Sequence, residues 1–174
     1  MNSDIKISEA TIDDINELVQ LVNSAYRGDS SKKGWTTEAD LLEGIRITEE
    51  ELLRQFNEPG HYLLKAINEA GKVIGCVSLL EKTEWMYLGM LTVQPDLQTA
   101  GIGKNLISAC ENFTIQKRKT GIEMTVISLR SELIAYYERR GFKQTGEKRP
   151  FPSDPKFGIQ KIPLEFVVLI KQVS

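Results

Sequence analysis

The sequence predicts an α/β (α+β) fold with a mixed, mostly antiparallel central sheet flanked by helices. Three strand-like runs follow one another with short connections in the middle of the chain, and a helix, a strand and a second helix come after them. No linker, internal repeat or low-complexity tract interrupts the 174 residues. A single domain over residues 1–174 is therefore expected.

The first part of the chain is expected to form a strand and then helices. The run DIKISEAT (4–11) alternates like a strand, and Thr11 with Asp14 forms a capping-box pattern before apolar residues that repeat every three or four positions. The polar loop RGDSSKKG (27–34) ends that helix. Two short helical patterns follow, TTEADLLEGI (36–45) and ITEEELLRQF (47–56).

The remaining elements alternate more regularly. HYLLKAI (61–67), KVIGCVSLL (72–80) and WMYLGMLTV (85–93) are predicted strands, and the connections NEAG and EKTE are short enough to keep them antiparallel. A helix over 103–116, a strand over 122–129 and a helix over 131–140 that closes at Gly141 come next. Two strands, around 142–148 and 163–171, are expected on either side of a proline-rich loop.

Composition narrows the possible functions. With 22 Lys plus Arg against 24 Asp plus Glu, the chain has no overall positive charge for nucleic acid or an anionic membrane. Its apolar runs are far shorter than the roughly 20 residues of a membrane helix, and the N-terminus has no secretory pattern. Cys76 and Cys110 are expected to be buried thiols in a cytoplasmic protein, and His61, the single histidine, a polar residue at a strand start. No metal site is expected.

The stretch QTAGIG (98–103) lies between a predicted strand and a predicted helix. Glycine lets the backbone approach a ligand closely, and the first turn of a helix offers unpaired N–H groups and the positive end of the dipole, so an anion is the expected ligand. A P-loop is excluded because Gln98 and Asn105 stand where it needs Gly and Ser or Thr. A dinucleotide fingerprint is excluded because position 106 is Leu.

With this element order, the pattern Gln-x-x-Gly-x-Gly and the later YYERRGF (136–142) resemble the GNAT superfamily of acyl-CoA-dependent N-acyltransferases. The resemblance covers nearly the whole chain at the level of element order. It implies a cytoplasmic N-acetyltransferase of GNAT-like fold that uses acetyl-CoA as co-substrate and moves the acetyl group to a primary amine by direct attack. A small-molecule amine is the expected acceptor, with no nucleic-acid partner, and a monomer or homodimer is expected.

The resemblance also implies which residues bind acetyl-CoA. Main-chain N–H groups at the helix start would bind the pyrophosphate, and the end of the preceding strand, splayed from its neighbour, would bind the pantetheine amides. Lys104 adds charge near phosphate or is simply solvated. Arg130 stands where many relatives have asparagine, and either reaches CoA or pairs with Glu132. The expected cofactor-binding residues are Leu91, Thr92, Val93, Gln98, Thr99, Ala100, Gly101, Ile102, Gly103, Lys104 and Arg130.

The implied catalytic residues begin with Tyr137, four residues before Gly141, which matches the family's general acid for the departing thiolate. A phenol is protonated at pH 7 and can donate that proton; the competing interpretation is that Tyr137 only packs in the core. Many relatives carry a glutamate base where this chain has Gly89. Glu84 or an ordered water would then serve as the base, although Glu84 equally fits a plain turn carboxylate.

Acceptor recognition in this family usually falls to the first two helices, the loop between them and the last two strands. Here these are YRGDSSKKGWTTEADLL (26–42), with Tyr26, Trp35 and Glu38 as candidate substrate-binding residues, and TGEKRPFP (145–152) as the opposite wall. Alternatively, Trp35 packs in the hydrophobic core, and Glu38 only stabilises the N-terminus of a helix. The sequence leaves the sign of the substrate charge open. A non-catalytic acyl-CoA-binding or sensing module is the alternative function.

Overall fold

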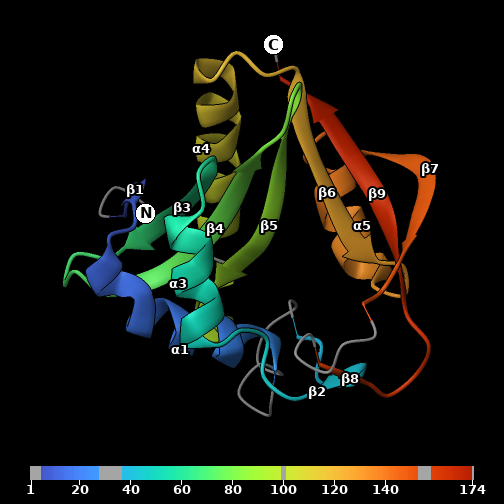
Figure 1. Cartoon of the computed structure of the whole chain (residues 1–174), viewed down its shortest axis with the longest axis horizontal. Helices are drawn as coiled ribbons and strands as arrows, with labels where there is room; N and C mark the ends of the chain where they lie inside the picture. Colours follow the sequence, from blue (N-terminus) through green and yellow to red (C-terminus); the bar gives the residue numbers. More distant parts are fainter. Residues whose placement is uncertain (1–4, 28–36, 99–100, 153–157, 174) are drawn as a thin grey trace.

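The computed structural model describes residues 5–27, 37–98, 101–152 and 158–173. A seven-stranded sheet with the strand order β1-β3-β4-β5-β6-β9-β7 forms the centre of the protein (Figure 1). Its strands are β1 (Lys6–Glu9), β3 (His61–Ile67), β4 (Val73–Glu81), β5 (Trp85–Val93), β6 (Gly121–Ile127), β7 (Lys143–Pro150) and β9 (Glu165–Gln172). Strands β5 and β6 are parallel and the other neighbouring pairs are antiparallel, which confirms the predicted mixed, mostly antiparallel sheet.

Helices cover both faces of this sheet. They are the short 3₁₀ turns η1 (Ile12–Asp14) and η2 (Pro95–Leu97) and the helices α1 (Ile15–Tyr26), α3 (Glu49–Asn57), α4 (Ile102–Gln116) and α5 (Ser131–Glu138). Successive residues of a strand point to opposite faces. Leu63 accordingly packs in a core with α1, whereas Leu64 packs in a second core with α4 and α5. Within the described ranges, no helix is long and apolar enough to cross a membrane.

The predicted helix over 36–45 is wrong in the part that the structure describes. Leu42 and Glu43 form a strand, β2, which pairs antiparallel with β8 (Ile159–Gln160), a short strand that the sequence did not indicate. Leu42 is buried, and the backbone N–H of Lys161 donates to the carbonyl of Leu41 at 2.9 Å. Pairing with a segment over 100 residues away therefore outweighs the local helical pattern.

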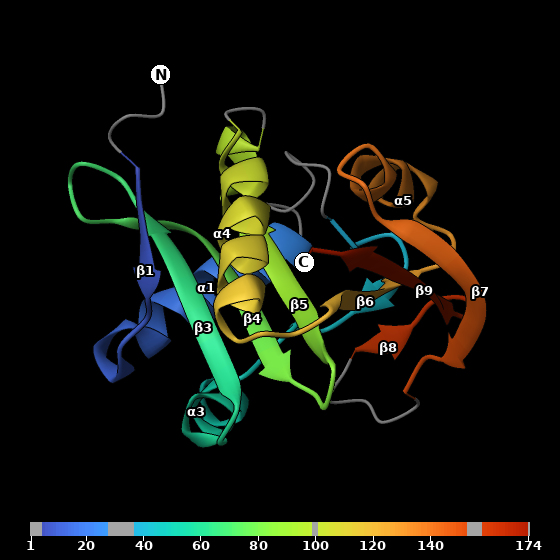
Figure 2. The same cartoon turned by 90° about the horizontal axis from the view of Figure 1, so that it is seen from above.

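Strands β5 and β6 pair over a short distance and then separate. Their register joins Trp85, Met86 and Tyr87 to Gly121, Ile122 and Glu123, and no further pair follows in the described residues. In Figure 1 the two strands meet beside the β4–β5 turn and diverge toward β2 and β8. Figure 2 shows β5 between the group β1, β3, β4 and the group β6, β9, β7. The sheet therefore opens between its two halves.

Candidate active site

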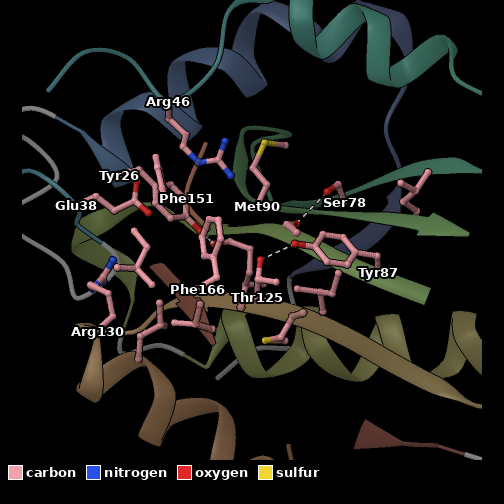
Figure 3. A pocket seen from close by; sticks show the side chains of 18 of the residues that line it. Tyr26, Glu38, Arg46, Ser78, Tyr87, Met90, Thr125, Arg130, Phe151 and Phe166 are labelled. Atoms are coloured by element: carbon pink, nitrogen blue, oxygen red, sulfur yellow. Dashed lines mark hydrogen bonds between the residues drawn. The ribbon is translucent and has the colours of Figure 1, made fainter. Parts of the chain in front are cut away.

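A cavity of about 340 Å³ lies where β5 and β6 diverge. Its wall combines the separated strands with side chains from α1, α5, β9 and the loops near β2 and β7, as the close-up in Figure 3 shows. Its lining residues include Tyr26, Arg27, Glu38, Arg46, His61, Ser78, Tyr87, Gly89, Met90, Leu91, Thr125, Arg130, Tyr137, Phe151, Pro152 and Phe166. Segments far apart in the sequence thus share one site.

A bulge in β5 shapes the floor of this cavity. Thr92 pairs with Cys76 and Gly89 with Ser78, so two residues of β5, Met90 and Leu91, oppose a single residue of β4. Met90 has a φ of 55°, which is unusual for a residue with a side chain. A bulge bends its strand and interrupts the regular pairing. The Leu91 carbonyl accepts a hydrogen bond from the Tyr26 hydroxyl, which fixes α1 against the bend.

The predicted phosphate-binding loop follows β5 directly. The Gln98 amide donates to the Val93 carbonyl at 3.0 Å, so Gln98 braces the loop against the strand end. Gly101, with a φ of 81°, is the N-cap of α4, and Ile102 anchors the first turn in the core. That turn contains no acidic residue. The N–H groups of the helix start therefore fit an anion, with Lys104 exposed beside them. Thr99 and Ala100 lie outside the described residues.

Three further residues that were predicted to bind acetyl-CoA, Thr92, Val93 and Gly103, are buried. Thr92 and Val93 are buried in the core, so only their main-chain groups are available to a ligand. At Gly103 the lack of a side chain serves packing, because a Cβ there would lie 2.6 Å from the Tyr136 hydroxyl oxygen of α5. Gly103 thus lets α5 approach the start of α4. The sequence analysis explained this glycine by the approach of a ligand and did not predict the packing role.

Tyr137 lies in the wall of the cavity and is 5% exposed. Its ring makes edge contacts with Phe142 at a centroid distance of 5.8 Å and with Tyr136 at 5.4 Å. Burial raises the pKa of Tyr137 well above the usual value of about 10, and the neighbouring Tyr26 and Tyr136 add to this shift. The side chain both packs in the core and lines the cavity, so its packing role is observed and its role as the acid stays a prediction.

The structure does not bring Glu84 to this site. Glu84 is exposed in the β4–β5 turn, where its carbonyl accepts from the Thr120 backbone N–H at 2.7 Å, at the end where β5 and β6 are paired. It is not among the residues that line the cavity. Gly89 does line the cavity, and the Ser78 hydroxyl donates to its carbonyl at 3.0 Å. Glu84 therefore remains a turn carboxylate in this arrangement.

The predicted acceptor-binding residues are partly assembled. Tyr26 lines the cavity and is almost fully buried, and burial raises the pKa of its hydroxyl. Glu38 also lines the cavity, but its carboxylate forms an ion pair with Arg27 at 2.9 Å, and both side chains are largely buried. Trp35 lies outside the described residues. Phe151 and Pro152, from the predicted opposite wall, line the cavity as well.

Several lining residues were missed by the sequence analysis. The Tyr87 hydroxyl and the Thr125 hydroxyl are 2.6 Å apart, which joins β5 and β6 inside the opening. His61, whose Nδ1 lies 3.2 Å from a Glu58 carboxylate oxygen, begins β3 as predicted and also lines the cavity. Arg46 carried no local signal, because it reaches the cavity only through the fold of the segment between β2 and α3. Alternation along 85–93 and 122–129 would have placed Tyr87 and Thr125 on faces of their strands, but not opposite each other.

Comparisons with known proteins bear on the family and the fold of this chain. A family model described as an acetyltransferase (GNAT) domain matches residues 37–152, about two thirds of the chain. No match was found among curated proteins.

Among solved structures, the ribosomal-protein-S18-alanine N-acetyltransferase from Escherichia coli aligns with 98% of this chain and 94% of its own, at 14% identity and a TM-score of 0.73. A spermidine/spermine N-acetyltransferase from Vibrio cholerae aligns with 99% of this chain and 95% of its own, at 15% identity and a TM-score of 0.70. A GNAT-family acetyltransferase from Staphylococcus aureus Mu50 aligns with 98% and 99%, at 18% identity and a TM-score of 0.69. These similarities confirm the predicted GNAT-like fold.

Proposed function

Because the chain belongs to the GNAT acetyltransferase family, we propose that it transfers the acetyl group of acetyl-CoA to a primary amine of a small molecule or peptide. One observation supports this most directly. The opening between β5 and β6 is lined by Tyr137, and the strand that forms one of its walls leads toward the start of α4, the proposed anion site. Under this proposal, β5 connects the donor's phosphate site with the cavity where the acid and the acceptor would meet.

The residues at this site fit acetyl-CoA as the donor. The main chain of Leu91, Thr92 and Val93 is the proposed contact for the pantetheine amides, since β5 has no partner strand toward β6 beyond Tyr87 in the described residues. The N–H groups from Gly101 through Lys104 are the proposed contact for the pyrophosphate. Lining the cavity beside Tyr137, Arg130 is the proposed additional cofactor contact.

Acetyl-CoA supplies an activated acetyl thioester. In the proposed reaction a neutral amine forms the new C–N bond, the C–S bond breaks, and the Tyr137 hydroxyl gives its proton to the departing sulfur. The amine nitrogen releases its proton to solvent, and Tyr137 takes up a proton from solvent again once CoA has left. Arg130 lines the cavity, and a positive charge near a bound ammonium lowers the pKa of that ammonium. We propose that this guanidinium favours the neutral amine in the absence of a carboxylate at Gly89.

The helix-start anion site can be tested with Gly101→Ala. We expect the affinity for acetyl-CoA to fall about tenfold, which corresponds to about 1.4 kcal/mol, because a side chain disfavours the left-handed backbone that aims the N–H groups. Gly71→Ala is a matched control, since Gly71 has a φ of 79° but has no atom within 4 Å of an added Cβ. Each variant is expected to lose about 1 kcal/mol of stability. Equal acetyl-CoA affinity in the two, measured by calorimetry, would contradict the proposed anion site.

The raised pKa of Tyr137 predicts a specific pH profile. A phenol whose pKa is raised stays protonated, and so remains able to donate, at every pH below that raised value. We therefore expect kcat/KM to rise with pH as the amine loses its proton, with no falling limb below about pH 10. The measurement is kcat/KM at saturating acetyl-CoA across this range, with the uncatalysed hydrolysis subtracted. A falling limb between pH 8 and pH 9 would argue against Tyr137 as the acid.

The experiment that tests the function itself is the release of CoA thiol from acetyl-CoA in the presence of polyamines, amino acids, aminoglycosides and lysine peptides. Amine-dependent release, together with an acetylated product detected by mass spectrometry, is the expected result. Binding of acetyl-CoA without release for any acceptor would instead favour an acyl-CoA-sensing module of the same fold.

A further inference from the structure

The charged side chains that line the cavity are mostly positive. Among the described residues they comprise three arginines, Arg27, Arg46 and Arg130, and one glutamate, Glu38. Glu38 is the carboxylate that a cationic acceptor would need. Its Oε1 atom accepts from Nε of Arg27 and lies 2.9 Å from Nη2 of the same guanidinium. Because Arg27 neutralises the charge of Glu38, the described wall offers no uncompensated negative charge to a cationic ligand.

Arg46 differs from Arg27 in its charge environment. Among the described residues, no carboxylate pairs with its guanidinium, which lies 5.5 Å from the centre of the Tyr26 ring. Its backbone is firmly held, because Oδ1 of Asn23 accepts from the N–H groups of Arg46 and Ile47 at 2.6 and 3.0 Å. Figure 3 shows the Arg46 side chain extending toward the cavity near Phe151. The backbone that carries this cation is therefore fixed beside the cavity, and its guanidinium is available to a ligand there.

This cation is separate from the proposed phosphate site. No described residue of the loop before α4 or of α4 itself lines the cavity that contains Arg46. Arg46 instead contacts Tyr26 of α1, and α1 packs on the face of the sheet opposite to α4. The anion that Arg46 is placed to bind is accordingly not the pyrophosphate at the start of α4.

Aromatic side chains form the rest of this wall. Phe151 and Phe166 have their ring centres 5.1 Å apart at an interplanar angle of 34°, and Tyr26 adds a third ring. We propose that the acceptor is an amino-acid-like compound, a primary amine that carries a carboxylate and an apolar body, with the carboxylate bound by Arg46. This inference rests on the proposed acetyl transfer and assigns the substrate class of the same site.

The test compares acceptors that differ only in the carboxylate. Apolar and aromatic amino acids, their carboxamides and the corresponding decarboxylated amines are each assayed for CoA release, alongside spermidine. The wild-type protein is expected to use the best amino acid with a kcat/KM at least about tenfold above that of its carboxamide. Arg46→Gln is expected to lower kcat/KM for that amino acid about 100-fold and for its carboxamide less than about threefold.

Arg54→Gln is the matched control, because Arg54 is an exposed arginine of α3 that pairs with Glu51 outside the cavity. A readout that does not need turnover is the binding of the N-acetyl amino acids, the reaction products, which should weaken in Arg46→Gln and not in Arg54→Gln. Release with spermidine or the decarboxylated amines in preference to amino acids would overturn the inference while the proposed acetyl transfer stands. An equal loss for amino acid and carboxamide in Arg46→Gln would also overturn it. Absence of release with every acceptor would overturn the proposed function. In that case, equal binding of the N-acetyl amino acids by the wild type and Arg46→Gln would separately overturn the carboxylate site.

Discussion

Replacing Tyr137 with phenylalanine is expected to lower kcat by about 100-fold or more while acetyl-CoA binds with unchanged affinity. The substitution removes one oxygen and keeps the ring, so the edge contacts with Phe142 and Tyr136 remain. What is lost is the proton that the departing sulfur needs. Steady-state kinetics of CoA release and a separate titration of acetyl-CoA distinguish the two effects.

Tyr62→Phe provides the control for this prediction. The Tyr62 hydroxyl donates to Glu81 at 3.2 Å and does not line the cavity. Its removal is expected to leave kcat within about twofold of the wild-type value. If Tyr137→Phe retains full turnover with the best acceptor, another group must protonate the sulfur. If it loses turnover and acetyl-CoA affinity together, Tyr137 contributes to donor binding as well.

Gly121→Ala is expected to destabilise the protein by about 3 kcal/mol, which would lower Tm by roughly 10 °C in a chain of this length. A Cβ at Gly121 would lie 2.2 Å from the Lys171 carbonyl oxygen and 2.7 Å from the Trp85 ring. The first neighbour is backbone of β9, which cannot move without breaking its pairing with β6. Gly121 thus permits the close packing at the paired end of β5 and β6.

Gly89→Ala separates this steric effect from the general cost of losing a glycine. An added Cβ there would lie 3.2 Å from the Ser78 hydroxyl oxygen, which can move away by a side-chain rotation at the cost of its hydrogen bond to the Gly89 carbonyl, a smaller adjustment than moving the backbone of β9. We expect a change in unfolding free energy of less than about 1 kcal/mol in chemical denaturation. Similar stability losses in the two variants would mean that β9 adjusts to an added methyl group more readily than the distances indicate.

Local sequence patterns were sufficient for most of the secondary structure. The strands over 61–67 and 85–93 have the predicted bounds, and α3 begins after the predicted cap at Thr48, whose side chain accepts from the Glu51 N–H. Patterns of this kind depend on neighbours a few residues apart. The described part of the predicted helix, 37–45, was predicted wrongly because its conformation depends on β8, a partner more than 100 residues later.

At the candidate site, too, local motifs were predictable and long-range contacts were not. The start of α4 and the position of Tyr137 on α5 were predictable because both belong to short motifs that can be read directly in the sequence. Arg46, Phe151 and Phe166 meet only after the chain has folded, and nothing in their local sequence marks them as neighbours. The charge of Glu38 was visible in the sequence, but its neutralisation by Arg27 was not.

The short pairing of β5 with β6 also determines how stiff the sheet is. Each half is stiff, because its strands are joined along much of their length, whereas three residue pairs join the halves across β5 and β6 in the described residues. A small change in the angle between the halves therefore disturbs few main-chain hydrogen bonds. At the last paired residue of β5, the Tyr87 to Thr125 hydrogen bond is a side-chain restraint on the spread of the strands. The two halves of the sheet are therefore held together mainly by side chains, including those of the core that packs α4 against both halves, and the proposed reacting groups lie where the main-chain pairing ends.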